Sequence, residues 1–260
     1  MLRTRILSAL VMAPPALVAV WLGGVAFALL VAAACAVMCW EWHKMTLKGF
    51  GPSGWVAALG GAAASLSVLH DPLAAVAVAV ITALVSAILA GPTVRVSTGL
   101  GAVYATLPSV ALVWLRQDQA SGLLTVIWLF LLVWGTDIGA YAAGRTIGGP
   151  LLMPAISPKK TWAGLLGGMA CAMLAGAGVA WWADLSAPVF IVFISAMLAV
   201  VAQAGDLLES WVKRRAGVKD SSTIIPGHGG VLDRVDGLLA AGLVVAVAAL
   251  AAAKPLLLWS

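Results

Sequence analysis

Long apolar segments follow one another along almost the whole chain, and this pattern constrains the fold more than any other feature of the sequence. A helix needs about 20 mostly apolar residues to cross the hydrocarbon core of a bilayer. Nine segments approach this length, and the split between the first two rests on Gly23 and Gly24. The predicted helices are 6–22, 24–42, 54–69, 72–90, 99–115, 122–144, 161–182, 187–208 and 235–257. The sequence therefore predicts an all-α, polytopic integral membrane protein with about nine transmembrane helices.

The composition supports lipid as the main solvent of the protein surface. Hydrophobic residues make up 63% of the chain and charged residues only 10%, whereas soluble domains carry about 25% charged residues. The 12 tryptophans fit a membrane protein, because indole rings favour the membrane–water interface. The net charge of +5 is explained by basic cytoplasmic loops, so no nucleic-acid partner is expected.

The basic residues predict the orientation in the membrane. With nine spans, 13 of the 15 lysines and arginines fall on the side of the N-terminus, and only Arg116 and Lys254 fall on the other. Basic residues accumulate in cytoplasmic loops, so the N-terminus is predicted to be cytoplasmic. The expected location of the protein is the inner (plasma) membrane. The 13 are Arg3, Arg5, Lys44, Lys48, Arg95, Arg145, Lys159, Lys160, Lys213, Arg214, Arg215, Lys219 and Arg234.

A single transmembrane domain over 1–260 is the simplest organisation, because the chain shows no repeat and no low-complexity tail. Within it, 1–120 are expected to be lipid-facing helices that could provide a homodimer contact. The catalytic helices and cytoplasmic loops are expected at 121–260.

Two polar stretches in the second half of the chain could carry chemistry. In WGTDIGAYAAGRTIGG (134–149), Asp137 stands within an apolar run, where an acid usually faces a cavity or a partner. The alternative is an Asp137 paired with a nearby arginine to fix packing. In SPKKTWAG (157–164), Ser157-Pro158 indicates a turn, and Thr161 could cap the next helix. Lys159 and Lys160 beside a helix N-terminus could bind an anion, or could simply anchor the chain at the cytoplasmic surface.

A third polar stretch runs from residue 205 to 236. On a helix, Asp206, Glu209 and Lys213 share one face, and Asp206 needs a partner such as a cation because it ends a long apolar span. Pro226 and the glycines 227, 229 and 230 exclude a continuous helix, and such a loop can present backbone N–H groups to phosphate. His228 could contact phosphate or move a proton, or could be a surface imidazole in a tight turn.

Carboxylates next to phosphate-binding groups suggest a divalent metal ion. Asp206 and Asp233 belong to different helices that end on the same side of the membrane, so the sequence predicts that they converge on a shared ion or ion pair. Mg²⁺ is typically held by one or two carboxylates together with substrate phosphates. Mg²⁺ is therefore the expected cofactor.

The run SWVKRRAGVKDSSTIIPGHGGVLDRVD (210–236) resembles the signature of the phosphatidate cytidylyltransferases, also called CDP-diacylglycerol synthases, of the bacterial type. The 134–149 and SPKKTW stretches fit the same family, whereas Ala163 replaces its usual glutamate. The resemblance implies a transferase of phospholipid biosynthesis that converts CTP and phosphatidate into CDP-diacylglycerol and pyrophosphate with Mg²⁺, at a site on the cytoplasmic side. By resemblance, Asp206 and Asp233 correspond to the metal-binding aspartates.

The remaining site assignments are hypotheses. The residues predicted to act in catalysis are Asp206, Asp233, Lys213 and His228. Those predicted to bind substrate are Asp137, Arg145, Lys159, Lys160, Arg214, Lys219, Asp220, Gly229, Gly230, Arg234 and Asp236.

Three other functions are compatible with parts of the pattern. A CTP-dependent lipid kinase of a related family would transfer the γ-phosphate instead. A multi-pass transporter would place polar groups near the bilayer midplane and often shows inverted repeats. An inactive homologue would be expected to lack acids and bases that this chain retains.

Overall fold

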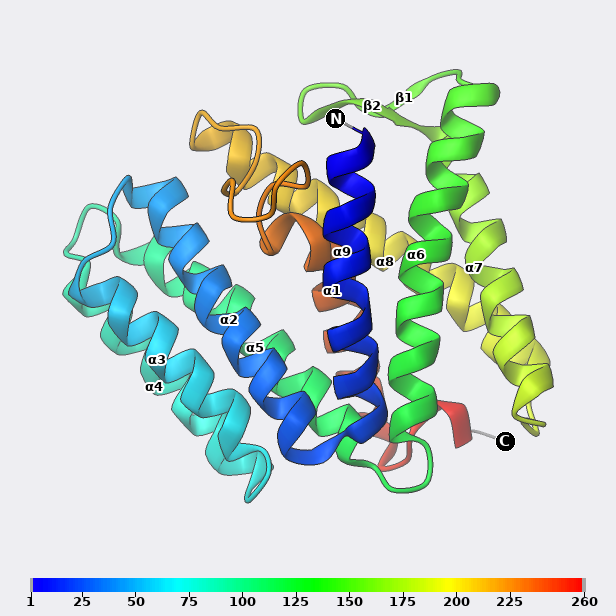
Figure 1. Cartoon of the computed structure of the whole chain (residues 1–260), viewed down its shortest axis with the longest axis horizontal. Helices are drawn as coiled ribbons and strands as arrows, with labels where there is room; N and C mark the ends of the chain where they lie inside the picture. Colours follow the sequence, from blue (N-terminus) through cyan, green and yellow to red (C-terminus); the bar gives the residue numbers. More distant parts are fainter. Residues whose placement is uncertain (1, 259–260) are drawn as a thin grey trace. The chain divides into compact units, whose positions relative to one another are not determined.

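The computed structural model describes residues 2–258 of the chain, with side chains for residue 11 and for 13–258. Arg3 and Arg5, which enter the predicted charge count, have side chains outside this described part. Within it, nine α-helices follow one another (Figure 1). They are α1 Leu2–Leu22, α2 Gly24–Leu47, α3 Pro52–Ser67, α4 Pro72–Leu89, α5 Arg95–Gln117, α6 Gly122–Thr146, α7 Trp162–Trp182, α8 Pro188–Arg215 and α9 Leu232–Ala252.

Seven of these helices are long and apolar enough to cross a membrane, counting only the described residues. The exceptions are α3, with 16 residues, and α1, whose described apolar part is Ala13–Leu22. Apolar side chains such as Ile81, Leu84 and Ile88 of α4 are largely exposed, as expected for a helix that faces lipid. The architecture is that of a polytopic membrane protein, as predicted. The number of nine spans and the orientation stay predictions.

The chain divides into two compact units. Unit 1 comprises Met1–Gln117 and Arg215–Val235, and unit 2 comprises Asp118–Arg214 and Asp236–Ser260. The predicted division into 1–120 and 121–260 within a single domain stays a prediction.

Small residues allow the helices of unit 1 to pack closely. Helices α2 to α5 lie against one another, in blue to green in Figure 1. Gly61 of α3 faces Cys35 of α2 and Thr106 of α5, and a Cβ at Gly61 would lie 2.8 Å from the Cys35 sulfur. Arg116 at the end of α5 donates hydrogen bonds to the carbonyl oxygens of Val20 and Trp21. These bonds connect α5 to the end of α1, just before the turn into α2.

Unit 2 is organised around a close helix pair. Helices α6 and α7 pack side by side over much of their length (Figure 1). A Cβ on Gly139 would collide with the carbonyl oxygen of Gly167, and a Cβ on Gly168 would lie 2.9 Å from that of Thr136. Glycines therefore set the short distance between these helices. On α8, the buried Ser195 hydroxyl accepts a 2.9 Å hydrogen bond from the indole N–H of Trp128.

A short β-hairpin between α6 and α7 departs from the all-α prediction. Strand β1 (Leu151–Met153) pairs antiparallel with β2 (Ser157–Thr161). Prolines 150, 154 and 158 prevent a helix here, and the sequence predicts a turn where the chain instead forms β2. The predicted cap is confirmed, because the Thr161 hydroxyl accepts a 3.0 Å hydrogen bond from the N–H of Gly164. The hairpin thereby sets Lys159 and Lys160 directly before α7.

Candidate active site

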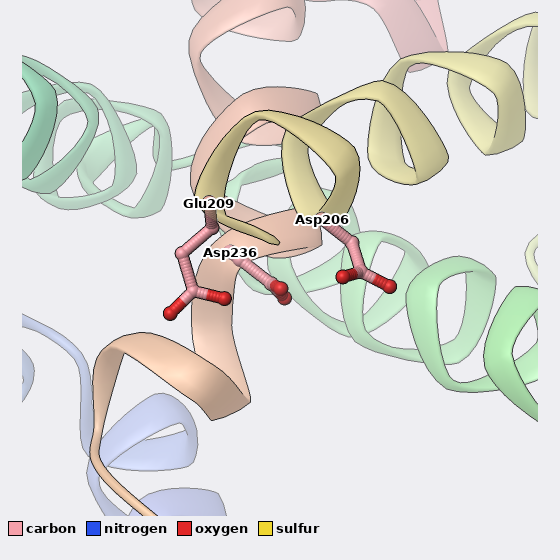
Figure 2. Close-up of side chains that lie close together, drawn as sticks. All are labelled: Asp206, Glu209 and Asp236. Atoms are coloured by element: carbon pink, nitrogen blue, oxygen red, sulfur yellow. The ribbon is translucent and has the colours of Figure 1, made fainter. Parts of the chain in front are cut away.

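Three carboxylates form the main acidic cluster of unit 2. Asp206 and Glu209 of α8 and Asp236 of α9 each offer an oxygen atom within 4.8 Å of the others (Figure 2). Helices α8 and α9 approach closely here because residue 205 is glycine. A Cβ at Gly205 would lie 2.8 Å from the carbonyl oxygen of Asp236 and 2.7 Å from the Cβ of Ala240.

Two lysines balance part of this negative charge. The Lys160 ammonium of β2 lies 2.6 Å from the Asp206 carboxylate, and that of Lys213 lies 2.7 Å from Glu209. Glu209 and Lys213 are both buried, so their charges interact with little screening by water. The cation partner predicted for Asp206 is thus present as Lys160. Asp206 and Glu209 each pair with one ammonium group, and Asp236 adds a third carboxyl group beside them.

Such an arrangement suits two kinds of ligand. Hard divalent cations prefer several carboxylate oxygens, and the cluster offers three within a small volume. Lysine ammonium groups bind phosphate as point charges, and both lysines already stand beside the carboxylates. The cluster could therefore hold a metal ion and a phosphate group next to each other.

Glu209 was missed as a site residue by reasoning from the sequence. The helical spacing places it on the face of Asp206 and Lys213, and its i,i+4 ion pair with Lys213 follows from that spacing. The spacing does not reveal that Glu209 and Lys213 are buried or that Asp236 lies close to Glu209.

A second group of polar side chains lies in unit 1, in the polar loop (residues 216–231) and the first turn of α9. One oxygen of Asp233, Oδ2, accepts hydrogen bonds from the N–H and the hydroxyl of Ser221, at 2.9 and 2.8 Å, and from the N–H of Gly230 at 2.7 Å. Gly229 has a φ of +85°, and a Cβ there would lie 2.6 Å from Asp233 Oδ2. Asp233 thus connects Ser221, within the polar loop, to Gly230 near its end.

Glu41 of α2 contacts the same loop and was also missed as a site residue. It is completely buried and accepts hydrogen bonds from the hydroxyl of Ser222 and from the N–H groups of Val231 and Leu232, at 2.7, 2.8 and 2.8 Å. The N–H groups of residues 230–232 are therefore bonded to carboxylates. The sequence predicts instead that the glycine loop presents such groups to phosphate.

His228 is half-buried in the polar loop. Its N–H donates to the carbonyl oxygen of Ile225, and the Ile225 N–H donates back to Gly229. The ring nitrogen Nδ1 is buried and has no hydrogen-bond partner among the described residues. The predicted catalytic role of His228 stays a prediction.

The other predicted site residues lie at the surface. Arg145 donates a 2.8 Å hydrogen bond to the Tyr141 hydroxyl, and its guanidinium carbon lies 6.0 Å from the centre of that ring. The exposed set is Asp137, Arg145, Lys159, Arg214, Lys219, Asp220 and Arg234.

The structure brings together Lys160, Asp206, Lys213 and Asp236 in unit 2. In unit 1 it brings together Asp220, Gly229, Gly230 and Asp233. The predicted metal pair, Asp206 and Asp233, divides between the two units, so their convergence stays a prediction.

The chain is similar to known proteins over most of its length. Residues 3–251 match the Cytidylyltransferase family. The chain is 39% identical over 254 residues to the phosphatidate cytidylyltransferase of Brucella suis biovar 1, covering 92% of this chain and 90% of the relative. It is 37% identical over 262 residues to that of Pseudomonas aeruginosa, covering 93% and 94%. A match to that of Staphylococcus aureus (strain COL) is 41% identical over 124 residues, or 47% of this chain and 48% of the relative.

Proposed function

The chain belongs to the cytidylyltransferase family, and from this premise we propose that it transfers the cytidylyl group of CTP to phosphatidate. The products are CDP-diacylglycerol and pyrophosphate. One observation carries the proposal: relatives named phosphatidate cytidylyltransferase are 37 to 39% identical to this chain over nearly its whole length. The chain is accordingly a nucleotidyltransferase enzyme.

The reaction exchanges one phosphorus–oxygen bond for another. A phosphate oxygen of phosphatidate forms a bond to the α-phosphorus of CTP, and the bond from that phosphorus to the bridging oxygen of the β-phosphate breaks. Pyrophosphate leaves with the electron pair. The substrates bring several negative charges together, so the site must supply positive charge and hold both phosphates in line.

Lys160 and Lys213 can supply part of this positive charge. Each ammonium group has three N–H donors and is bonded here to a carboxylate at 2.6 or 2.7 Å. An arriving phosphate can share these donors without a large movement of either side chain. The exposed lysines and arginines, Lys159, Arg214, Lys219 and Arg234, would attract CTP from water.

Mg²⁺ is the proposed cofactor, and the carboxylate cluster fits it. Asp206, Glu209 and Asp236 would hold the ion, because their oxygens lie within 4.8 Å of one another and hard cations prefer such ligands. Asp233, which the sequence predicts as a metal ligand together with Asp206, stays a prediction. When bound, the ion would neutralise charge on the reacting phosphates.

The remaining features of the proposal concern the membrane. The nine helices would all cross or enter the bilayer, with the N-terminus and the active site on the cytoplasmic side of the inner membrane. CTP would then arrive from water and phosphatidate from the lipid. The N-terminal helices would provide the contact of a homodimer.

Labelled CTP tests the reaction directly. The detergent-solubilised protein is incubated with phosphatidate, Mg²⁺ and CTP carrying ³²P at either the α or the γ position. Cytidylyl transfer places only the α label in lipid. The γ label in lipid would show a lipid kinase, and no lipid label in either arm would refute both enzymatic reactions. Removal of divalent ions with EDTA should abolish the α labelling, and Mg²⁺ should restore it.

A further inference from the structure

We propose that Glu41 is a positioning residue, which fixes the polar loop and the first turn of α9 for catalysis. The inference rests on the proposed cytidylyl transfer, because Asp233 and His228 lie in these segments. Glu41 belongs to α2 and reaches residues 181 to 191 positions later in the chain. Among the described residues, Glu41 forms no hydrogen bond or ion pair with a predicted catalytic side chain, so its effect would pass through the loop.

The charge of Glu41 is compensated by hydrogen bonds. The side chain is 0% exposed and forms no ion pair among the described residues. A buried carboxylate is costly unless hydrogen bonds replace its hydration. Two of its three donors are the N–H groups of Val231 and Leu232, where α9 begins. Such groups have no partner inside the helix, and the positive end of the helix dipole favours a carboxylate there.

Gly230 shows that the loop is built around this carboxylate. A Cβ at residue 230 would collide with Glu41 Oε1 and with the Ser221 hydroxyl oxygen. The need for glycine here comes from lack of space, since Gly230 is not among the residues with positive φ. A substitution at 230 would have to displace Glu41 or Ser221.

Glu41 and Asp233 together close the base of the polar loop. Glu41 joins Ser222 to Val231 and Leu232, while Asp233 joins Ser221 to Gly230. Both carboxylates therefore link Ser221 and Ser222, within the polar loop, to the end of the loop and the start of α9. Without Glu41, the hydrogen bonds that join it to Ser222, Val231 and Leu232 would be lost, and the neighbouring Asp233 and His228 would be held less firmly. Small displacements of reacting groups can lower a rate by about 100-fold.

Graded substitutions of Glu41 test the role. Glu41→Gln keeps one acceptor oxygen but turns an NH₂ group toward a backbone N–H, and Glu41→Ala removes all three hydrogen bonds. We expect kcat to fall about tenfold for Gln and about 100-fold for Ala, with a much smaller change in the KM for CTP. Glu41→Asp keeps the charge on a shorter side chain and should retain more activity than Ala.

Hydrogen exchange gives a readout that does not depend on activity. In Glu41→Ala, the amides of residues 221–232 should exchange faster, while those of α3 and α4 keep their wild-type rates. Ser86→Ala is the matched control, because it removes a buried 2.7 Å hydrogen bond to the Ser53 carbonyl within the same unit. This control should leave both kcat and exchange in the loop unchanged.

Two results would overturn the inference. One is a kcat within twofold of wild type in Glu41→Ala. The other is faster exchange throughout unit 1 with a loss of activity that only follows the loss of folded protein, since that pattern indicates a general structural role. If the wild-type protein fails to label lipid from α-labelled CTP, the proposed function fails, whereas the exchange experiment still tests whether Glu41 holds the loop.

Discussion

The acidic cluster of unit 2 and Glu41 of unit 1 stabilise the negative charge of carboxylates in different ways. In unit 2, Asp206 and Glu209 are balanced by the ammonium groups of Lys160 and Lys213. In unit 1, the buried carboxylate of Glu41 accepts hydrogen bonds from the Ser222 hydroxyl and from the backbone N–H groups of Val231 and Leu232, where α9 begins. Side-chain ammonium groups can reorient toward a phosphate, but backbone N–H groups cannot. The cluster of unit 2 is therefore suited to exchanging partners during a reaction, and the group around Glu41 to holding one conformation.

The strongest test of this contrast removes a negative charge from the acidic cluster of unit 2. Asp206→Asn keeps the size of the side chain. It removes the carboxylate that pairs with Lys160 and one of the three carboxylates proposed to hold the ion. We expect activity to fall by more than about 100-fold. Losing a group that only supports a metal ligand costs about 10- to 100-fold, and Asp206 is proposed to bind the ion itself. CTP incorporation into lipid measures this, with Asp233→Asn assayed in parallel.

Asp71→Asn is the matched control, because Asp71 caps α4 at an exposed position where asparagine caps equally well. It should keep wild-type activity. Near-normal turnover in both Asp206→Asn and Asp233→Asn would contradict the assignment of these aspartates to the metal.

The buried ion pair in unit 2 allows a second test. Lys213→Met removes the ammonium group that lies 2.7 Å from the buried Glu209 carboxylate, and breaking a buried ion pair in this way should destabilise the protein by about 3–5 kcal/mol. The double variant Lys213→Met with Glu209→Met replaces the pair by apolar groups and should regain most of this stability. Thermal unfolding in detergent measures both effects.

Activity separates stability from function in these variants. The double variant should stay inactive although it is folded, because it lacks one lysine and one carboxylate of the cluster. An active double variant would show that the pair is only a packing feature of α8.

The smallest effect is expected from a substitution beside Glu41 in unit 1. Gly230→Ala adds one methyl group where Glu41 Oε1 and the Ser221 hydroxyl already lie, and overpacking of this kind costs about 1–3 kcal/mol. Urea or thermal unfolding measures the loss. Gly49→Ala in the same unit is the control, since the nearest atom to its added Cβ is the Leu47 carbonyl oxygen at 3.9 Å and its φ is not positive. Equal stability of the two variants would mean that the loop adapts easily and that the contrast between the two groups is weaker than proposed.

The helices could be predicted closely from the sequence, because apolar runs and their interruptions determine them locally. The predicted 122–144 corresponds to α6, Gly122–Thr146, and the predicted 72–90 to α4, Pro72–Leu89. The prediction for α8 was too short, since 187–208 corresponds to Pro188–Arg215. Its last two turns are polar, and hydropathy alone does not extend a helix beyond the apolar run.

The hairpin and the two missed glutamates depend on contacts that a linear pattern does not contain. Strands of three and five residues with a proline among them show no clear alternation, so the sequence indicates only a turn at Ser157-Pro158. Glu41 lies at the end of an apolar helix and gains its role only from a loop about 190 residues later. Glu209 gains its role from burial beside Lys213 and from Asp236 on another helix.

The hydrogen bonds between Glu41 and the start of α9 also have a consequence in time. The ribosome makes α2 early, but the N–H groups that satisfy Glu41 belong to Val231 and Leu232, which emerge 190 and 191 residues later. Until then, the Glu41 carboxylate lacks these three hydrogen bonds. The polar loop can take its final form only when synthesis has reached the last helix, so an incompletely synthesised chain would not become an active enzyme in the membrane.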